Sequence, residues 1–209
     1  MDVLEKWKEI FETYLCDNVI FDGSHDIGHS RRVWKNAINI MPQHVDKLVV
    51  LAGSYFHDIV SFPKKHPNRS RSSIDAANKA EEILITMNFP IEKIENVKHC
   101  IEAHSFSAKI SPRTIEAKII QDADRMEALG AIGLARTFYV AGKIGSDLFD
   151  DNDPMSIDRE PNDKKYALDH FKVKLLKLSE KMHTAGGKIE AERRTEILTN
   201  FIKDLNKEL

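Results

Sequence analysis

Hydrophobic residues recur along this chain every three to four positions, which is the period of a helix that packs one face against a core. The period is clear over residues 3–14, 33–40, 45–56, 74–87, 94–104, 166–182 and 188–205. A longer pattern, apolar on more than one side, runs from Arg113 to about Ala141 and predicts a buried central helix, in which Gly130 and Gly133 allow close helix contact. Because no stretch alternates polar and apolar residues as a strand does, we expect an all-α bundle.

Two polar segments, residues 61–73 and 143–165, interrupt the helical pattern and are expected to be loops. Loops of this length within a compact domain are usually functional or disordered. A chain of 209 residues can bury one substantial core. We therefore expect a single domain over residues 1–209, with a core of about residues 20–142 and C-terminal helices, 166–207, packed on it.

The charge is nearly balanced, with 31 basic and 33 acidic residues and a formal net charge of −2. A protein without a broad basic field is not drawn to nucleic acid or to an acidic membrane surface, so an anionic ligand must be met by a local group of cations. No segment has the ~20 apolar residues of a membrane span, and the two cysteines, Cys16 and Cys100, make no disulfide framework. We expect a cytoplasmic protein, monomeric or homodimeric, that binds neither nucleic acid nor membrane.

The stretch SHDIGHSRRV, residues 24–33, places His25 and His29 four positions apart with Asp26 between them. Ser24 or Asp26 could cap a helix that starts here, and a histidine pair alone seldom marks a metal site. Taken by itself, the stretch favours a structural role.

Further candidate ligands follow on other predicted helices, namely His57 with Asp58, and then Asp122 or Asp124. Each has a structural explanation, as a helix cap or as the partner of a nearby arginine. Together with His29 they lie on three otherwise apolar helices, where unpaired carboxylates are costly to bury unless a cation meets them. Two imidazoles and two carboxylates would balance a divalent ion and leave positions open for water and substrate oxygens.

The order of these motifs resembles the HD-domain superfamily of metal-dependent phosphohydrolases, whose name comes from the His-Asp pair. A narrower similarity, to the YedJ-like subfamily of bacterial HD-domain proteins, extends over SHDIGHSRRVWKNA, FHDIVSFPKKHPNRSRSS, IEAHSFSA, EAKIIQDADRMEALGAIGLAR and KKYALDHFKVKLLKL. The resemblance implies an all-α HD fold and hydrolysis of phosphoester or phosphoanhydride bonds, usually of nucleotides. It also implies one divalent ion, for which we expect Mn2+ first, with Mg2+, Fe2+, Ni2+ and Co2+ as alternatives.

Carried over through this resemblance, His29 is the first metal histidine, and His57 with Asp58 is the defining pair. The last ligand is the Asp directly before a basic residue in an AD(R/K) context, which here is Asp124. Helical phase does not choose between Asp124 and Asp122. We take Asp124 as the ligand and expect Asp122 to support the ligands from behind.

The sequence leaves the general base open. Some related nucleotidases carry a Glu three residues after the His-Asp pair, where this chain has Ser61. Water bound to the ion could serve without such a base, because coordination lowers its pKa toward neutrality, and Asp58 is then the catalytic candidate that orients this water. His25 is the second catalytic candidate, contacting phosphate or orienting Asp26, with a hydrogen bond at the helix start as the alternative.

A basic, serine-rich loop directly follows the ligand pair and contains Lys64, Lys65, Arg69 and Arg71. Ammonium and guanidinium groups suit phosphate oxygens, so we expect Lys64 and Arg69 to bind substrate; a solvated basic loop is the alternative. His104 lies on an apolar stripe, where a core histidine is the usual explanation, but the resemblance of its HSF motif favours a substrate-binding position.

These features lead to one preferred function and two alternatives. We expect a metal-dependent phosphohydrolase that acts on nucleotides, with a nucleoside triphosphate split into the monophosphate and pyrophosphate. A nucleotide phosphomonoesterase is the first alternative. A regulatory module that binds metal or nucleotide without useful turnover is the second.

Overall fold

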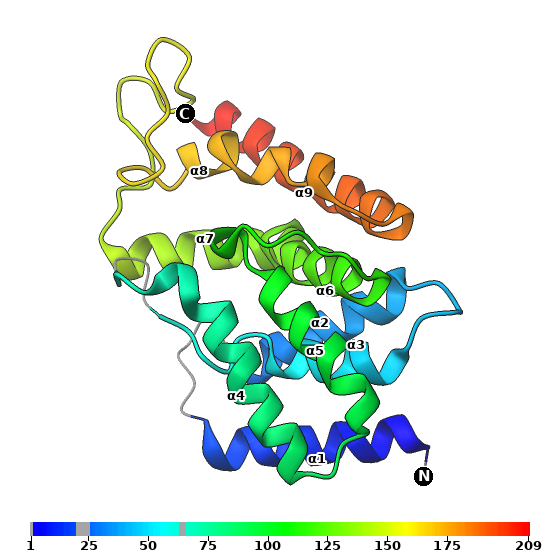
Figure 1. Ribbon diagram of the computed structural model, residues 1–209. Helices are drawn as coiled ribbons and strands as arrows, with labels where there is room; N and C mark the ends of the chain where they lie inside the picture. The colour runs from blue at the N-terminus through cyan, green and yellow to red at the C-terminus, as the bar shows by residue number, and fades with distance from the viewer. Residues whose placement is uncertain (1, 20–25, 63–65) are drawn as a thin grey trace. The chain divides into compact units, whose positions relative to one another are not determined.

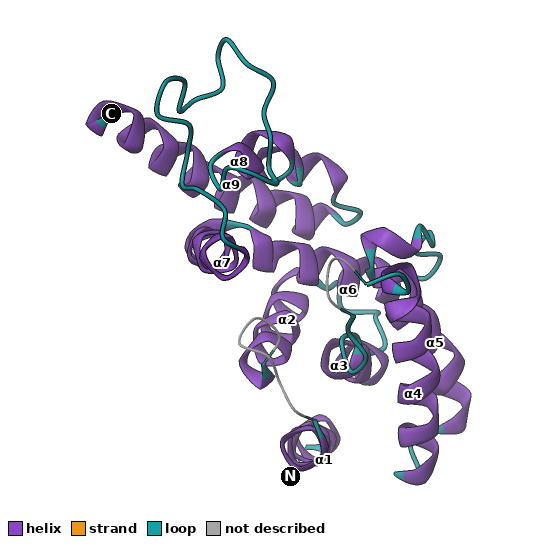
Figure 2. Cartoon of the chain, turned by 90° about the vertical axis from the view of Figure 1, so that its left-hand side faces the viewer, coloured by secondary structure: helices purple, strands orange, loops and turns teal. Residues whose placement is uncertain are grey.

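The computed structural model describes residues 2–19, 26–62 and 66–209 as helices joined by turns and loops, with no strand in those ranges (Figures 1 and 2). The all-α fold expected from the hydrophobic period is therefore confirmed. Within the same ranges, no helix combines the length and the apolar composition that crossing a membrane requires. The chain divides into two compact units, Met1–Asp124 and Arg125–Leu209.

The first unit contains α-helices and two short 3-10 helices. Its elements are α1 (Val3–Asn18), α2 (Ile27–Ile40), α3 (Lys47–Phe56), η1 (Arg69–Arg71), α4 (Ser72–Thr86), α5 (Ile91–His104), η2 (Phe106–Ala108) and α6 (Ile115–Arg125), whose last residue already belongs to the second unit. The predicted helical stripes of this part of the chain all coincide with helices.

Helix α3 forms the centre of the first unit. Its residues from Val49 to Phe56 are buried, and it contacts α1, α2, α4 and α5. Figure 2 shows α2 and α5 on either side of it. A Cβ added to Gly53 would lie 2.2 Å from Ile120 Cδ1, so this glycine makes room for the Ile120 side chain of α6 against the middle of α3.

Short polar signals set the helix ends in the first unit. The Asp26 side chain caps α2 by accepting a hydrogen bond from the backbone N–H of His29 at 2.8 Å. The capping role considered for Asp26 is thus observed. After α4, Asn88 adopts a left-handed backbone with φ 56°, which asparagine tolerates better than most residues, and Pro90 precedes the next helix.

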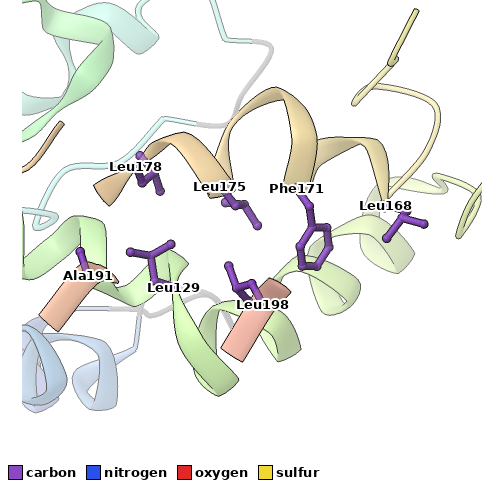
Figure 3. Close-up of a cluster of buried hydrophobic side chains, with 7 residues drawn as sticks. All are labelled: Leu129, Leu168, Phe171, Leu175, Leu178, Ala191 and Leu198. Carbon is purple, nitrogen blue, oxygen red and sulfur yellow. The ribbon is translucent and has the colours of Figure 1, made fainter. Parts of the chain in front are cut away.

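The second unit contains η3 (Met126–Ala128), α7 (Gly130–Ile144), α8 (Asp169–Val173), η4 (Leu175–Lys177), η5 (Ser179–Lys181) and α9 (Ala185–Glu208). Its buried core, shown in Figure 3, is formed by the residue before α7, by the segment from Leu168 to Leu178 and by α9. The residues are Leu129, Leu168, Phe171, Leu175, Leu178, Ala191 and Leu198. The chain forms two compact units, and the single-domain arrangement, with residues 166–207 packed on the 20–142 core, stays a prediction.

The single long helix expected from Arg113 to Ala141 is wrong. Helix α6 ends at Arg125, a 3-10 turn follows, and Leu129 is extended before Gly130, whose φ is +67°. A Cβ on Gly133 would lie 2.2 Å from the carbonyl carbon of Ala128, so this glycine permits the turn between η3 and α7 within the second unit. The apolar pattern continues through the turn because residues on both sides of it are buried.

The helix expected over residues 166–182 is also interrupted. It consists of α8 followed by the two 3-10 helices η4 and η5, with Lys174 in a non-helical conformation between α8 and η4. Leu175 and Leu178 still reach the core, because a 3-10 turn repeats every three residues and keeps residues i and i+3 on one side.

Candidate metal centre

Three side chains from separate helices of the first unit converge on one point. His29 lies in the first turn of α2, His57 directly follows α3, and Asp124 lies near the end of α6. His29 Nε2 is 3.1 Å from His57 Nε2 and 3.5 Å from Asp124 Oδ1, and His57 Nε2 is 3.8 Å from the same oxygen. Among the described residues, these three form the group of donor atoms able to hold a metal ion.

Asp58 joins this group and links it to a third imidazole. Its Oδ2 is 3.7 Å from His29 Nε2 and 3.5 Å from His57 Nε2. Its Oδ1 is 3.5 Å from His104 Nε2. The carboxylate thus faces the two histidines with one oxygen and His104 with the other.

Backbone carbonyls hold two of the imidazole rings in place. His57 Nδ1 donates to the Ser54 carbonyl oxygen at 3.0 Å, and His104 Nδ1 donates to that of Ile101 at 2.6 Å. A carbonyl can only accept, so each Nδ1 carries the proton. In a neutral ring the Nε2 lone pair then points toward the carboxylates, as a metal-ligating histidine requires.

Burial keeps His57 neutral. The side chain is fully buried, and this lowers its pKa to about 4 although the Asp58 and Asp124 carboxylates act in the opposite direction. At neutral pH the Nε2 lone pair of His57 is therefore available to a cation.

For Asp124 and His104, contacts with their partners outweigh the effect of burial on the pKa. Burial alone would raise the pKa of Asp124, but contact with His29 and the nearby imidazoles hold it well below its usual range. Burial alone would lower the pKa of His104, but its contact with Asp58 raises it above the ordinary value. Asp124 is therefore a carboxylate at neutral pH.

The spacing of these atoms fits a divalent ion. Bonds of about 2.1 Å in an octahedral or tetrahedral shell put neighbouring ligand atoms roughly 3.0–3.4 Å apart, close to the observed range of 3.1 to 3.8 Å. The His57 Nε2 lone pair faces His29 Nε2 at 3.1 Å, a separation at which a cation or a proton lies between two ring nitrogens. The donor set of two imidazoles and two carboxylates is suited to a divalent metal.

The centre is open on its carboxylate side. The His29 and His57 side chains are 2% and 0% exposed, whereas those of Asp58 and Asp124 are 24% and 28% exposed. A cavity of about 10 Å³, room for about one water molecule, lies against His29 and Asp58. Water and substrate can therefore reach the centre past the two carboxylates.

Comparison with known proteins now identifies the family. The HD domain family matches residues 26–129, and the Bacillus subtilis protein YpgQ is 31% identical over 190 residues, covering 88% of this chain and 84% of its own length. The chain belongs to the HD-domain family. The YedJ-like placement within it stays a prediction.

Solved structures of similar proteins cover nearly the whole chain. Bacillus subtilis YpgQ in complex with ADP is 30% identical with a TM-score of 0.75, covering 99% of this chain and 96% of its own. An HD-superfamily hydrolase from Bacillus thuringiensis is 30% identical with a TM-score of 0.72, covering 98% and 95%. The Lin1889 protein from Listeria innocua is 27% identical with a TM-score of 0.73, covering 100% and 97%. The fold is thus that of HD-superfamily hydrolases.

The geometry supports Asp124 rather than Asp122 as the carboxylate ligand of this HD domain. Asp124 Oδ1 lies beside both histidines, whereas Asp122 is fully buried two residues earlier and is not in the group of converging donors. The assignment stays a prediction, as does the supporting role of Asp122.

The predicted phosphate-binding loop of the HD domain is described only in part. His25, Lys64 and Lys65 lie outside the described residues. Arg69 donates a hydrogen bond to the Phe62 carbonyl oxygen, so this guanidinium also shapes its own loop. The η1 helix that contains Arg69 contacts η2, which follows His104 closely in the chain. The basic segment therefore lies beside the His104 end of α5.

Two polar residues that support the centre were not found from the sequence. Asn36 Nδ2 donates to the carbonyl oxygen of Ala123 at 3.2 Å and joins α2 to α6 next to Asp124. Gln121 Nε2 donates to the carbonyl oxygen of Ala103 at 2.5 Å and joins α6 to α5 next to His104. Both side chains are buried. In the sequence they could have been noticed as amide residues at helical positions whose neighbours are apolar.

Proposed function

We propose that this HD domain is a metal-dependent phosphohydrolase that converts a nucleoside triphosphate into the monophosphate and pyrophosphate. The observation that carries the proposal is the convergence of His29, His57, Asp58 and Asp124 on one point that is open on its carboxylate side. A relative described as an HD-superfamily hydrolase supports the reaction class. The ADP bound to the Bacillus subtilis relative supports a nucleotide as the substrate.

The residues of the centre divide into ligands and positioning groups. His29, His57, Asp58 and Asp124 would hold one divalent ion, for which we propose Mn2+. A divalent ion held there supplies charge for phosphoryl oxygens and lowers the pKa of water toward neutrality. No nucleophilic serine or cysteine is needed for such a hydrolysis.

The proposed role of Asp58 is to orient the attacking water. Its Oδ2 faces the two metal histidines, and a cavity sized for about one water lies against it. His104 fixes the carboxylate from the other side, because its Nε2 lies 3.5 Å from Asp58 Oδ1 while its Nδ1 is held by a carbonyl. The catalytic role proposed for His25, which lies outside the described residues, is to contact phosphate or to orient Asp26.

The basic segment after the ligand pair favours a substrate with several phosphates. Lys64 and Arg69 are proposed to bind phosphate oxygens, and a loop that carries several cations suits a triphosphate better than a monophosphate. Cleavage between the α and β phosphates is our preferred position.

Hydrolysis in ¹⁸O-labelled water tests this function. Purified protein is incubated with Mn2+ and a panel of nucleotides, and the products are separated and weighed by mass spectrometry. We expect one labelled oxygen on either the monophosphate or the pyrophosphate, and no turnover in Asp58→Asn. Labelled orthophosphate from a monophosphate, with triphosphates untouched, would show a phosphomonoesterase instead. Binding of nucleotide without turnover would show a regulatory module.

A further inference from the structure

Both polar groups of the Phe62 backbone are bound by residues that follow it in the chain. The Phe62 N–H donates a hydrogen bond to Ser72 Oγ at 3.2 Å, and the Phe62 carbonyl oxygen accepts one from Arg69 Nη1. The Phe62 ring also stacks on the ring of His66, with 4.6 Å between the centroids and 9° between the planes. Phe62 is therefore fixed by three contacts, with residues 66, 69 and 72.

These contacts set the direction of one of the two guanidinium groups of η1. Arg69 turns back to the Phe62 carbonyl, whereas Arg71 Nη2 lies 3.7 Å from Asp75 Oδ1 on the surface of α4. Among the described residues, the Nε and Nη2 groups of Arg69 have no hydrogen-bond partner. Because a guanidinium carries five N–H donors, Arg69 can keep its bond to Phe62 and still offer donors to a phosphate.

The same basic segment is tied to the proposed metal centre on two sides. At the start of α4, the Ser73 hydroxyl donates to the Glu102 carbonyl oxygen at 3.0 Å, in the last turn of α5. That turn ends in His104, whose Nε2 lies 3.5 Å from Asp58 Oδ1. On the other side, Phe62 follows Asp58 by four residues, so their Cα atoms are at most about 14 Å apart. The basic segment is thus joined to the two segments that carry Asp58 and His104.

We propose that Ser72 is a positioning residue that, by holding the Phe62 backbone, directs the Arg69 guanidinium to the phosphates of the substrate. This inference rests on the proposed function, because it takes Arg69 as a phosphate ligand. A side chain that is already held in place loses less conformational freedom when the substrate binds. Ser72 acts without touching the substrate, so its loss should weaken substrate binding only through Arg69.

A double-mutant cycle tests the inference. The ligand is α,β-methylene ATP, which resists cleavage between the α and β phosphates, and its dissociation constant is measured by calorimetry with excess Mn2+. In the wild-type background, Ser72→Ala should weaken binding roughly 3- to 10-fold, as expected for loss of one hydrogen bond. In the Arg69→Ala background the same change should weaken binding less than about twofold, because no guanidinium is left to position. Ser72→Thr keeps the hydroxyl and should keep the wild-type affinity.

Thr86→Ala provides a matched control at the opposite end of α4. Thr86 is about 21 Å from Ser72 for a helix of this length, and its hydroxyl donates to the Ile83 carbonyl oxygen at 2.7 Å. Losing this hydrogen bond should leave the nucleotide affinity unchanged. Equal weakening by Ser72→Ala in both backgrounds, or no weakening in the wild-type background, would overturn the positioning role while leaving the proposed function intact. A wild-type protein that neither binds nor cleaves nucleotides would instead contradict the proposed function itself.

Discussion

His57 shows how one residue acquires its chemistry from its surroundings. An exposed imidazole is partly protonated near neutral pH, whereas burial lowers the pKa of His57 to about 4 and the Ser54 carbonyl holds its Nδ1 proton. The remaining nitrogen is a neutral donor aimed at the centre. Such a residue is expected to bind a metal ion more tightly than any exposed histidine of the chain.

Replacing His57 should therefore remove the metal. His57→Ala removes a side chain that binds the metal directly in the proposed site. Loss of a residue that only hydrogen-bonds to a ligand already lowers metal affinity about 10- to 100-fold, so we expect metal affinity to fall by at least about 100-fold. Metal content after dialysis against Mn2+ and a titration of metal binding measure it. His44→Ala removes an exposed imidazole and serves as the control. Equal metal content in the two variants would contradict the proposed ligand set.

The candidate residues of the centre could be predicted from the sequence, because histidine and aspartate stand out on otherwise apolar helices. The sequence did not predict which atoms these residues contact. Helical phase could not choose between Asp122 and Asp124, because both face buried neighbours, and the choice depends on where Asp124 Oδ1 lies relative to two other helices. The supporting amides of Asn36 and Gln121 bond to backbone carbonyls, which leave no trace in a residue pattern.

At the scale of helices, Glu12 links α1 to α2 and α3, the helices that position the proposed metal ligands His29 and His57. Its Oε1 accepts from the Tyr55 hydroxyl at 2.6 Å and from Arg31 Nε at 3.1 Å, and its Oε2 accepts from Arg31 Nη2 at 2.6 Å. The Tyr55 ring is almost fully buried, whereas Arg31 is half exposed. Most of the stabilisation is therefore expected from the tyrosine contact, because water screens the exposed pair.

Removing this carboxylate should destabilise the first unit. In Glu12→Ala the buried Tyr55 hydroxyl loses a charged acceptor, which is expected to cost about 1–3 kcal/mol in the free energy of unfolding. Chemical denaturation followed by circular dichroism measures the change. Glu12→Gln keeps an acceptor and should lose less, and Glu5→Ala, which breaks the exposed pair with Lys8, should stay within about 0.5 kcal/mol. A Glu12→Ala protein as stable as Glu5→Ala would show that the contact is not stabilising.

Helix periodicity predicted most of the elements and missed their interruptions. The stripes of α1, α2, α4 and α5 coincide with helices because each of these helices buries one face. Helix α3 also coincides with its stripe, although it is buried on all sides from Val49 to Phe56. The break at Leu129 and Gly130 was missed because the chain is buried before and after it, so the apolar pattern does not change. The decisive feature is the contact of Gly133 with the backbone of Ala128, which a pattern of residue types does not contain.

For the molecule as a whole, the two units depend on different polar centres. The proposed metal ligands all belong to Met1–Asp124. In Arg125–Leu209, the loop before α8 is held by Arg159, whose Nη1 and Nη2 donate to Asp169 at 2.5 and 2.8 Å. The backbone N–H of Asn162 donates to the same carboxylate at 2.6 Å. Metal should therefore act on the first unit, whereas Asp169 is a group through which acid should act on the second.

Acid should weaken the second unit through Asp169. Burial alone would raise the pKa of this carboxyl, but the hydrogen bonds from Arg159 and Asn162 lower it below its ordinary value. A pKa that is lower in the folded than in the unfolded state contributes stability above the unfolded value, about 4, and this stability is lost as the pH falls through the folded pKa. Asp169→Asn should lose about 1–3 kcal/mol at pH 7 and show a flatter decline of stability below about pH 4. Thermal unfolding across that pH range measures both effects, with Asp204→Asn, an exposed partner of Lys207, as the control. If wild type and Asp169→Asn lose stability in parallel as the pH falls, then Asp169 is not the group whose protonation weakens the unit.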